Sequence, residues 1–166
     1  AAGCSSNPEP AGPVVVPAAT AEQKKTLWDP LAALAGEWEM TDDKGNKVPA
    51  LSIVVTSAGS IVHERLFPGG GHEMTNIYHM DGGELVLTHY CAMGNQPTMR
   101  AKAANGNEIV FTFDGVTNLR AVDEMYMGSM KLVITDKDHI VQTWTSYKNG
   151  KADPSFEVTM NCERKK

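Results

Sequence analysis

An alternation of apolar and polar residues with a period of two limits the possible folds of this chain more than any other feature. It runs from residue 37 to residue 163, and turn-forming stretches such as Pro68-Gly69-Gly70-Gly71 and Asn105-Gly106-Asn107 break it about every eight to twelve residues. Alternate residues of a strand share a face, so this pattern is typical of a β-sandwich or a β-barrel. It predicts strands near residues 37–42, 50–57, 61–67, 73–80, 83–92, 98–104, 108–114, 129–136, 139–147 and 155–163.

The connections between these strands are short, so strands that follow each other in sequence should pair antiparallel and form a meander. A meander of about ten strands has two exposed edges unless the sheet closes, and closure removes both. We therefore predict an all-β fold, an antiparallel meander barrel of about ten strands, with a sandwich as the alternative. The longest connection, 115–128, is a candidate lid or binding loop.

The segment before the strands divides into two parts. Leu27, Leu31 and Leu34 have helical spacing, which predicts a short helix with Pro30 in its first turn and Gly36 as its stop. Residues 1–24 are rich in Pro, Ser and Ala without any period, as in an extended, flexible tether. The predicted organisation is a leader, 1–24, and one β-barrel domain, 25–166.

Alternation also assigns the inward face of most strands. Strands 61–67 and 139–147 carry polar residues on both faces and stay unassigned. The residues predicted to point inward are His89 and a larger group of mostly apolar residues. That group consists of Trp38, Met40, Leu51, Ile53, Val55, Met74, Tyr78, Met80, Leu85, Leu87, Cys91, Met93, Met99, Ile109, Phe111, Phe113, Met130, Leu132, Ile134, Phe156, Val158, Met160 and Cys162.

The charge balance argues against nucleic acid as a partner. The 166 residues carry a net charge of −5 with acids and bases interleaved, whereas phosphate binding needs clustered Lys and Arg. Hydrophobic residues make up 42% of the chain and charged residues 21%, as in a globular protein. No apolar run approaches the ~20 residues of a membrane-spanning helix. The nine methionines fit either an accommodating pocket or, more simply, an ordinary core.

The first six residues, Ala1-Ala2-Gly3-Cys4-Ser5-Ser6, resemble the cleavage site of a bacterial lipoprotein. Ala2, Gly3 and Cys4 match that pattern, while Ala1 stands where Leu is usual. The resemblance implies that Cys4 carries lipid and holds the protein at a membrane surface, in the bacterial cell envelope, as a periplasm-facing or outer-membrane lipoprotein. The alternative is a chance cysteine in the leader.

Two further stretches carry a resemblance to known barrels. Leu34-Ala35-Gly36-Glu37-Trp38 resembles the Gly-any-Trp start of lipocalin-like (calycin) barrels, in which a short helix closes one end and the Trp packs beneath it. Leu87-Thr88-His89-Tyr90-Cys91, followed by Gly94-Asn95-Gln96-Pro97, is similar to a group of uncharacterised bacterial barrel proteins. These resemblances imply a small barrel around an internal cavity and no known activity. Haem-binding nitrobindin-like barrels share the ten-strand layout, but their glycine pattern is absent beyond Gly36, so no cofactor is predicted.

The candidate ligand site lies on two neighbouring predicted strands. His89 and Cys91 share a face, and Asn76 and Tyr78 on the preceding strand lie within contact range of them. A few convergent polar groups in an apolar cavity are the usual form of a small-ligand site. The alternative is a buried network that only stabilises the core. The predicted ligand-binding residues are Met74, Asn76, Tyr78, Met80, Leu87, His89, Cys91 and Met99.

The sequence supports catalysis and metal binding less well than it supports ligand binding. A Cys beside a His can form a nucleophile, but no Asp or Glu on these two strands shares the inward face to orient His89. His63, His72 and His79 lack the spacing of metal ligands, so no metal is predicted. Glu64 and Arg65 face opposite ways, so either one points inward and holds a ligand's charged group, or, more simply, both are solvated.

The sequence therefore predicts an exported, lipid-anchored binding protein that holds a small apolar or amphipathic molecule inside a β-barrel. The alternative is a filled barrel that acts in protein interactions through the rim loops 68–72 and 115–128. An enzyme that uses His89 and Cys91 is the third hypothesis. Cys91 and Cys162 are expected to be free, buried thiols, because their strands should lie on opposite walls.

Overall fold

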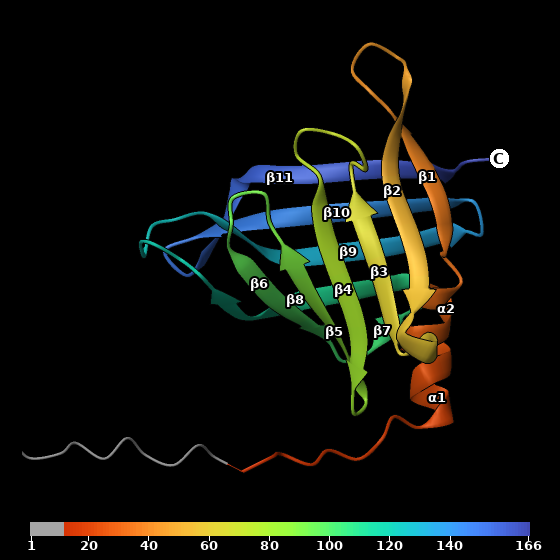
Figure 1. Cartoon of the computed structure of the whole chain (residues 1–166), viewed down its shortest axis with the longest axis vertical. Helices are drawn as coiled ribbons and strands as arrows, with labels where there is room; N and C mark the ends of the chain where they lie inside the picture. The colour runs from red at the N-terminus through yellow and green to blue at the C-terminus, as the bar shows by residue number, and fades with distance from the viewer. Residues whose placement is uncertain (1–11) are drawn as a thin grey trace, which may run out of the picture.

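The computed structural model describes residues 12–166 (Figure 1). Cys4 and the rest of the lipoprotein-like start lie outside the described residues. The elements in chain order are α1 (Ala21–Gln23), η1 (Lys24–Trp28), α2 (Asp29–Ala32), β1 (Gly36–Thr41), β2 (Lys47–Thr56), η2 (Ser57–Gly59), β3 (Ile61–Leu66), β4 (Met74–Asp81), β5 (Glu84–Tyr90), β6 (Gln96–Ala101), β7 (Ala104–Asn105), β8 (Glu108–Thr117), β9 (Tyr126–Asp136), β10 (His139–Lys148) and β11 (Lys151–Arg164).

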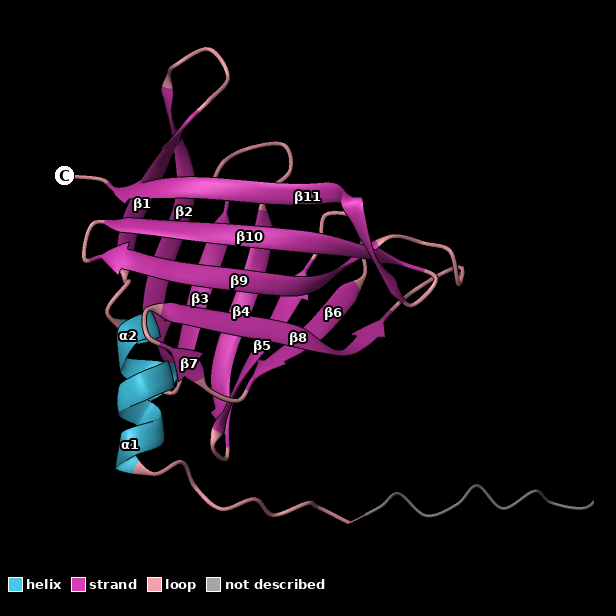
Figure 2. Ribbon diagram, turned by 180° about the vertical axis from the view of Figure 1, so that it is seen from behind, coloured by secondary structure: helices cyan, strands magenta, loops and turns pink. Residues whose placement is uncertain are grey.

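The strands of the described chain form one closed, antiparallel, ten-stranded barrel, which confirms the predicted fold. Each long strand pairs with its neighbours in sequence, and the pairings β1–β11 and β6–β8 close the sheet. The two-residue β7 pairs only with β8. Figure 2 shows β8–β11 as one wall that crosses in front of β1–β5.

The helical segment begins earlier than the leucine spacing predicts. It starts at Ala21 rather than near Leu27, and a capping box stabilises its start: Thr20 Oγ1 accepts from the Gln23 N–H, and Gln23 Oε1 accepts from the Thr20 N–H. These bonds satisfy two backbone donors that the first helical turn leaves free. The Thr20-to-Gln23 spacing was the sequence signal for this start. Pro30 consequently lies well inside the helical run instead of in its first turn.

The helix closes one end of the barrel, as the lipocalin-like resemblance implies. Leu27, Leu31 and Leu34 are buried in the core, and the Trp38 indole N–H donates to the Leu34 carbonyl at 2.9 Å. The guanidinium of Arg164 lies 4.4 Å from the centre of the Trp38 ring. The connections 67–73, 91–95 and 118–125 lie at the opposite end of the barrel, which we call the open end.

Most of the predicted inward residues are buried. The fully buried ones are Trp38, Leu51, Ile53, Tyr78, Leu85, Leu87, His89, Met99, Ile109, Phe111, Met130, Leu132, Met160 and Cys162. Met40, Met74, Met80, Ile134 and Val158 are half-buried and pack against this core. The period-two pattern therefore identified the core correctly through the middle of each strand.

Four of the residues predicted to point inward are 37–47% exposed: Val55, Met93, Phe113 and Phe156. Val55 lies beyond the start of β1, because the first residue of that strand, Gly36, pairs with Ile53. Met93 lies in the turn after β5. Phe113 lies where β8 has separated from β9, and Phe156 lies in a bulge of β11. Val55 pairs with the buried Val62 and Phe113 with the buried Met99, so both keep the predicted inward face and are exposed because a neighbouring strand is missing beside them. Phe156 lines the pocket at the open end. Met93, in a turn, lies outside the alternation.

The two unassigned strands contribute polar residues to the interior. On β3 the buried residues are Val62, Glu64 and Leu66, and on β10 they are Ile140, Gln142, Trp144 and Ser146. Glu64 is thus inside the barrel, which contradicts the simpler interpretation that Glu64 and Arg65 are both solvated.

Candidate functional site

Three neighbouring strands bring the polar residues of the interior together. In the register of β3, β4 and β5, Glu64 lies opposite Asn76, and Asn76 lies opposite His89. Gln142 on β10 reaches the same place from the other wall, and Gln142 Nε2 donates to Glu64 Oε1 at 2.6 Å. All four side chains are buried. A polar network therefore spans the barrel below the open end.

Glu64 is the centre of this network. Its Oε2 accepts one hydrogen bond from the Tyr78 hydroxyl and one from Asn76 Nδ2, each at 2.6 Å. The Trp144 indole N–H donates to Gln142 Oε1 at 3.1 Å and extends the network along β10. A buried carboxylate needs such donors, because an unpaired one would be costly to remove from water.

Burial controls the protonation of the network. Burial raises the pKa of Glu64, while its hydrogen bonds to Tyr78, Asn76 and Gln142 oppose that rise. Burial and the nearby Glu64 raise the pKa of Tyr78 well above its usual value. Burial lowers the pKa of His89 to about 4. Tyr78 and His89 are therefore neutral near pH 7.

His89 links the network to a pocket at the open end. Its Nδ1 lies 2.7 Å from Asn76 Oδ1, whereas its Nε2 is buried and has no hydrogen-bond partner in the described structure. The His89 ring also packs on Trp144, with 5.0 Å between the ring centres. A buried acceptor without a donor costs about 1–3 kcal/mol.

The pocket beside His89 is small and almost entirely apolar. Its volume is about 190 Å³. Small-molecule sites usually have volumes from ~300 Å³ upward, but an apolar cavity of ~150 Å³ is large enough to bind benzene. The pocket therefore fits a molecule of about one ring. Its lining residues are Leu66, Phe67, Met74, His89, Met127, Trp144, Phe156, Val158 and Met160.

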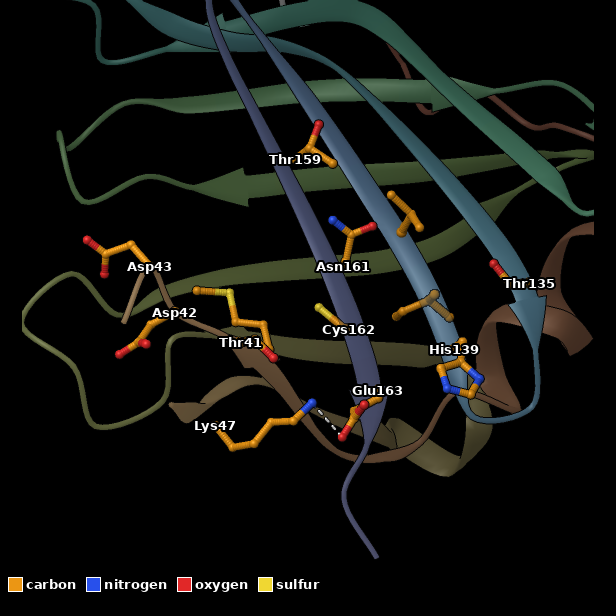
Figure 3. Close-up of a pocket in the computed structure, with 13 residues that line it drawn as sticks. Thr41, Asp42, Asp43, Lys47, Thr135, His139, Thr159, Asn161, Cys162 and Glu163 are labelled. Carbon is orange, nitrogen blue, oxygen red and sulfur yellow. Dashed lines mark ion pairs between the residues drawn. The ribbon is translucent and has the colours of Figure 1, made fainter. Parts of the chain in front are cut away.

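A larger hollow, of about 770 Å³, lies on the outer surface between the β1–β2 hairpin and strands β9–β11 (Figure 3). Thr159, Asn161 and Glu163 alternate with the buried Met160 and Cys162, so their side chains face outward. Its ion pair, Lys47 to Glu163 at 2.6 Å, joins half-exposed side chains. Ion pairs exposed to this degree contribute little free energy. The inner pocket, which joins apolar walls to a buried polar network, is the stronger candidate site.

The structure brings together some of the predicted ligand-binding residues and separates others. Asn76, Tyr78 and His89 meet in the network, and Met74 and His89 line the pocket. Leu87 and Met99 have no exposed surface and belong to the core. Met80 lies at the helix end, beside Trp28, and faces a different hollow.

Cys91 lies just beyond β5 and is half-buried, so the prediction that it is fully buried was wrong. Its Sγ accepts a long hydrogen bond, 3.5 Å, from the Met93 N–H. The acid of the network, Glu64, bonds to Asn76 and not to His89. This arrangement does not form the acid–base–nucleophile series that activates a cysteine.

Sequence reasoning left Glu64 as an open alternative outside the predicted site and missed Gln142 and Trp144. Glu64 is flanked by Val62 and Leu66 at spacing two, and Gln142 and Trp144 follow Ile140 at the same spacing. That alternation was available in the sequence, but the polar residues on both faces of these strands obscured it.

The second family-like stretch builds the rim of the open end. Asn95 Nδ2 donates to the Met125 carbonyl at 3.0 Å, and Gln96 Oε1 accepts from the Thr117 hydroxyl at 2.8 Å. The first bond attaches the turn 91–95 to the connection between β8 and β9, and the second joins the paired ends of β6 and β8. That connection covers only residues 118–125, because β8 and β9 extend further than predicted into the range 115–128.

No protein-family model matches this sequence, and no curated protein matches it with significant similarity. Within residues 12–166, no three His, Cys, Asp or Glu side chains are grouped so that they could hold a metal ion. In the same range, no helix combines the length and apolar character needed to cross a membrane. The family resemblance is therefore supported by the barrel architecture alone.

Proposed function

We propose that this chain is a binding protein that holds a small, largely apolar molecule at the open end of its barrel. The observation that carries this proposal is the apolar pocket, about 190 Å³, whose one polar boundary is the buried His89. An apolar pocket with few convergent polar groups is the usual form of a small-ligand site.

The filled core limits the size of the ligand. Leu87, Met99, Phe111 and Met130, in the middle of four strands, have no exposed surface. Close-packed side chains leave no room for a ligand in the centre of the barrel. The ligand is therefore about one ring in size and lies above the polar network, rather than deep inside the barrel.

The expected lipid anchor and location are part of the same proposal. A lipid on Cys4 would hold the barrel at a membrane surface of the bacterial cell envelope. Cys4 lies outside the described residues, so this part is supported by the sequence pattern alone. The test is metabolic labelling with a radioactive fatty acid in a bacterial host that expresses the precursor. We expect label in the natural chain and none in Cys4→Ser.

The ligand proposal is tested by native mass spectrometry of the protein purified from its own host. We expect an added mass that fits one small molecule. Val158→Phe, which fills the pocket from β11, should remove this mass. The matched control is Val110→Phe, because Val110 is exposed and outside the pocket. A natural chain that carries no ligand and binds no single-ring compound would contradict the proposal.

A filled-core interaction protein is the second candidate function. It is favoured by exposed apolar side chains at the open end, of which Val122 is 80% exposed. Such residues are a usual component of protein-binding surfaces. The double variant Met93→Ser with Val122→Ser separates the two candidates. A binding protein should keep its small ligand in this variant, whereas an interaction protein should lose its partner.

A further inference from the structure

We propose that β11 accepts an extended, basic segment of another protein as an added strand. β11 runs from Lys151 to Arg164, but it pairs with β1 only at Glu163 and Arg164. Before Glu163, its one partner in the described structure is β10. The edge of β11 that faces away from β10 is therefore free over most of the strand. Free edges of this kind bind extended peptides, which add to the sheet through backbone hydrogen bonds.

The edge is free because the β1–β2 hairpin diverges from β11. If the register of Glu39 and Glu163 continued, Thr41 would pair with Asn161, but β1 and β11 are no longer paired there. The hairpin instead rises past β11 (Figure 2). It leaves the hollow of about 770 Å³ that Thr41 and Asn161 both line (Figure 3). There is thus open space beside β11 for an added strand.

The backbone bonds at the end of β11 show which residues direct their backbone groups to this edge. The Arg164 N–H donates to the Asp138 carbonyl, on the β10 side. The Lys165 N–H donates to the Glu37 carbonyl, on the β1 side. Backbone groups of successive residues in a strand point to opposite sides. Even-numbered residues of β11 therefore bond toward β10, and odd-numbered residues point toward the β1 side.

This alternation continues along the free part of β11, because its pairing with β10 has no register shift between Glu163 and Glu157. Three residues therefore present N–H and C=O groups to the free edge: Glu157, Thr159 and Asn161. All three residues are exposed, and Thr159 and Asn161 line the hollow. None of the three has a pairing partner on the β1 side. An added strand would find these backbone groups unpaired.

The two faces of β11 specify the side chains of the added strand. Residues directly opposite each other on neighbouring strands share a face and contact one another. Positions opposite Val158 and Met160 point inward, where these two side chains line the apolar pocket of the open end. Positions opposite Glu157, Thr159 and Asn161 point outward. The segment that fits therefore alternates apolar and polar residues.

The charges along the edge favour a basic segment. Three carboxylates line the hollow, those of Asp42, Asp43 and Glu163. The one lysine among its lining residues, Lys47, is paired with Glu163. Glu157 adds a carboxylate further along the free edge. Opposite charges on neighbouring strands attract, and like charges destabilise the pair. A second copy of β11 would bring the same carboxylates to this edge, so it fits less well.

The test is amide hydrogen exchange of the whole chain, followed by NMR, with and without the peptide acetyl-Lys-Val-Thr-Val-Lys-amide. Paired antiparallel, the peptide places its threonine opposite Thr159 and its lysines opposite Glu157 and Asn161. In the free chain, the amides of Thr159 and Asn161 should exchange fast, whereas that of Met160, which faces β10, should exchange slowly. The peptide at millimolar concentration should slow the exchange of Thr159 and Asn161 by about fivefold at about four-fifths occupancy.

Matched controls separate strand addition from other contacts. N-methylation of the peptide's threonine removes the N–H that faces Thr159 and should abolish the effect. N-methylation of its first valine, whose N–H points away, should not. Glutamate in place of both lysines should weaken binding by roughly fivefold or more. In the protein, Glu157→Lys should weaken binding of the lysine peptide, whereas Glu22→Lys, at an exposed position on α1, should leave it unchanged.

Slow exchange of Thr159 and Asn161 in the free chain would overturn the inference, because the edge would already be covered. Sedimentation of the chain as a dimer would then identify a second copy as the cover. Fast exchange that the peptide leaves unchanged would also overturn it, as would equal effects of the lysine and glutamate peptides. None of these results bears on the proposed small ligand, which native mass spectrometry tests separately.

Discussion

His89 makes the stability of the barrel depend on pH. Burial lowers its pKa from 6.5 to about 4, so between these values the unfolded chain binds a proton that the folded chain excludes. Acidification through this window therefore favours unfolding. A shift of this size corresponds to roughly 3 kcal/mol.

We predict that the free energy of unfolding of the natural chain, minus that of His89→Phe, decreases as the pH falls from 6.5 to 4. Contributions from groups that the two proteins share cancel in the difference. Urea unfolding of both proteins at several pH values measures this difference in unfolding free energy. A difference that is independent of pH would show that His89 is protonated in the folded state or accessible to water.

Glu64 satisfies three donors, so replacing it with an apolar residue should be costly. In Glu64→Leu, the donors of Asn76, Tyr78 and Gln142 remain buried without their acceptor. We expect a loss of about 3 kcal/mol or more in unfolding free energy. Glu157→Leu is the control: Glu157 is exposed on β11, so a change within about 0.5 kcal/mol is expected. Equal losses in both variants would contradict this account of Glu64.

At the scale of the elements, the junction between α2 and β1 depends on one glycine. Gly36 has a φ of +142°, and an added Cβ would lie 2.6 Å from Arg164 Nη1. Arg164 bonds to the Ala35 carbonyl at 2.8 Å and covers Trp38, so it cannot move without loss. The glycine of the Gly-any-Trp stretch is thus required by this close packing.

We predict that Gly36→Ala destabilises the barrel by about 1–3 kcal/mol, a typical cost of backbone strain. Gly115→Ala is the control, because its φ is not positive and no atom lies within 4 Å of the added Cβ. The midpoints of thermal unfolding of the two variants, each compared with the natural chain, test this prediction. An unchanged midpoint for Gly36→Ala would mean that Arg164 can be displaced without cost.

At the scale of the whole molecule, the barrel keeps the two described cysteines apart. Cys91 follows β5 at the open end, and Cys162 lies on β11 and faces the core. Both are free. Burial raises the pKa of the Cys162 thiol to about 12, so its reactive thiolate is scarce as well as inaccessible.

Thiol titration of Cys4→Ser without reductant checks this arrangement. Cys91 should react in the folded protein because it is partly exposed, and Cys162 should react only after unfolding. Two thiols in total are expected. If no thiol reacts even after unfolding, the two cysteines are bridged, and the strand order of the barrel would have to be different.

The sequence alone was enough to predict the ten strands and most of their inward faces, because both depend on local features. Turn residues act over a few positions, and alternation needs only the geometry of one strand. The partial exposure of Val55 and Phe156 could not be predicted in this way, because the extent of β1 and the bulge in β11 arise from pairing with other strands.

The tertiary structure alone decided which polar residues meet and how much space they leave. Glu64 and Gln142 are 78 positions apart in the chain and touch only because the barrel closes. Likewise, whether methionines and aromatic rings fill the interior depends on how opposite walls pack, which no single strand encodes. The sequence therefore predicted Asn76, Tyr78 and His89 as inward neighbours, whereas the bond between Glu64 and Gln142 and the small pocket beside His89 emerged only from the closed barrel.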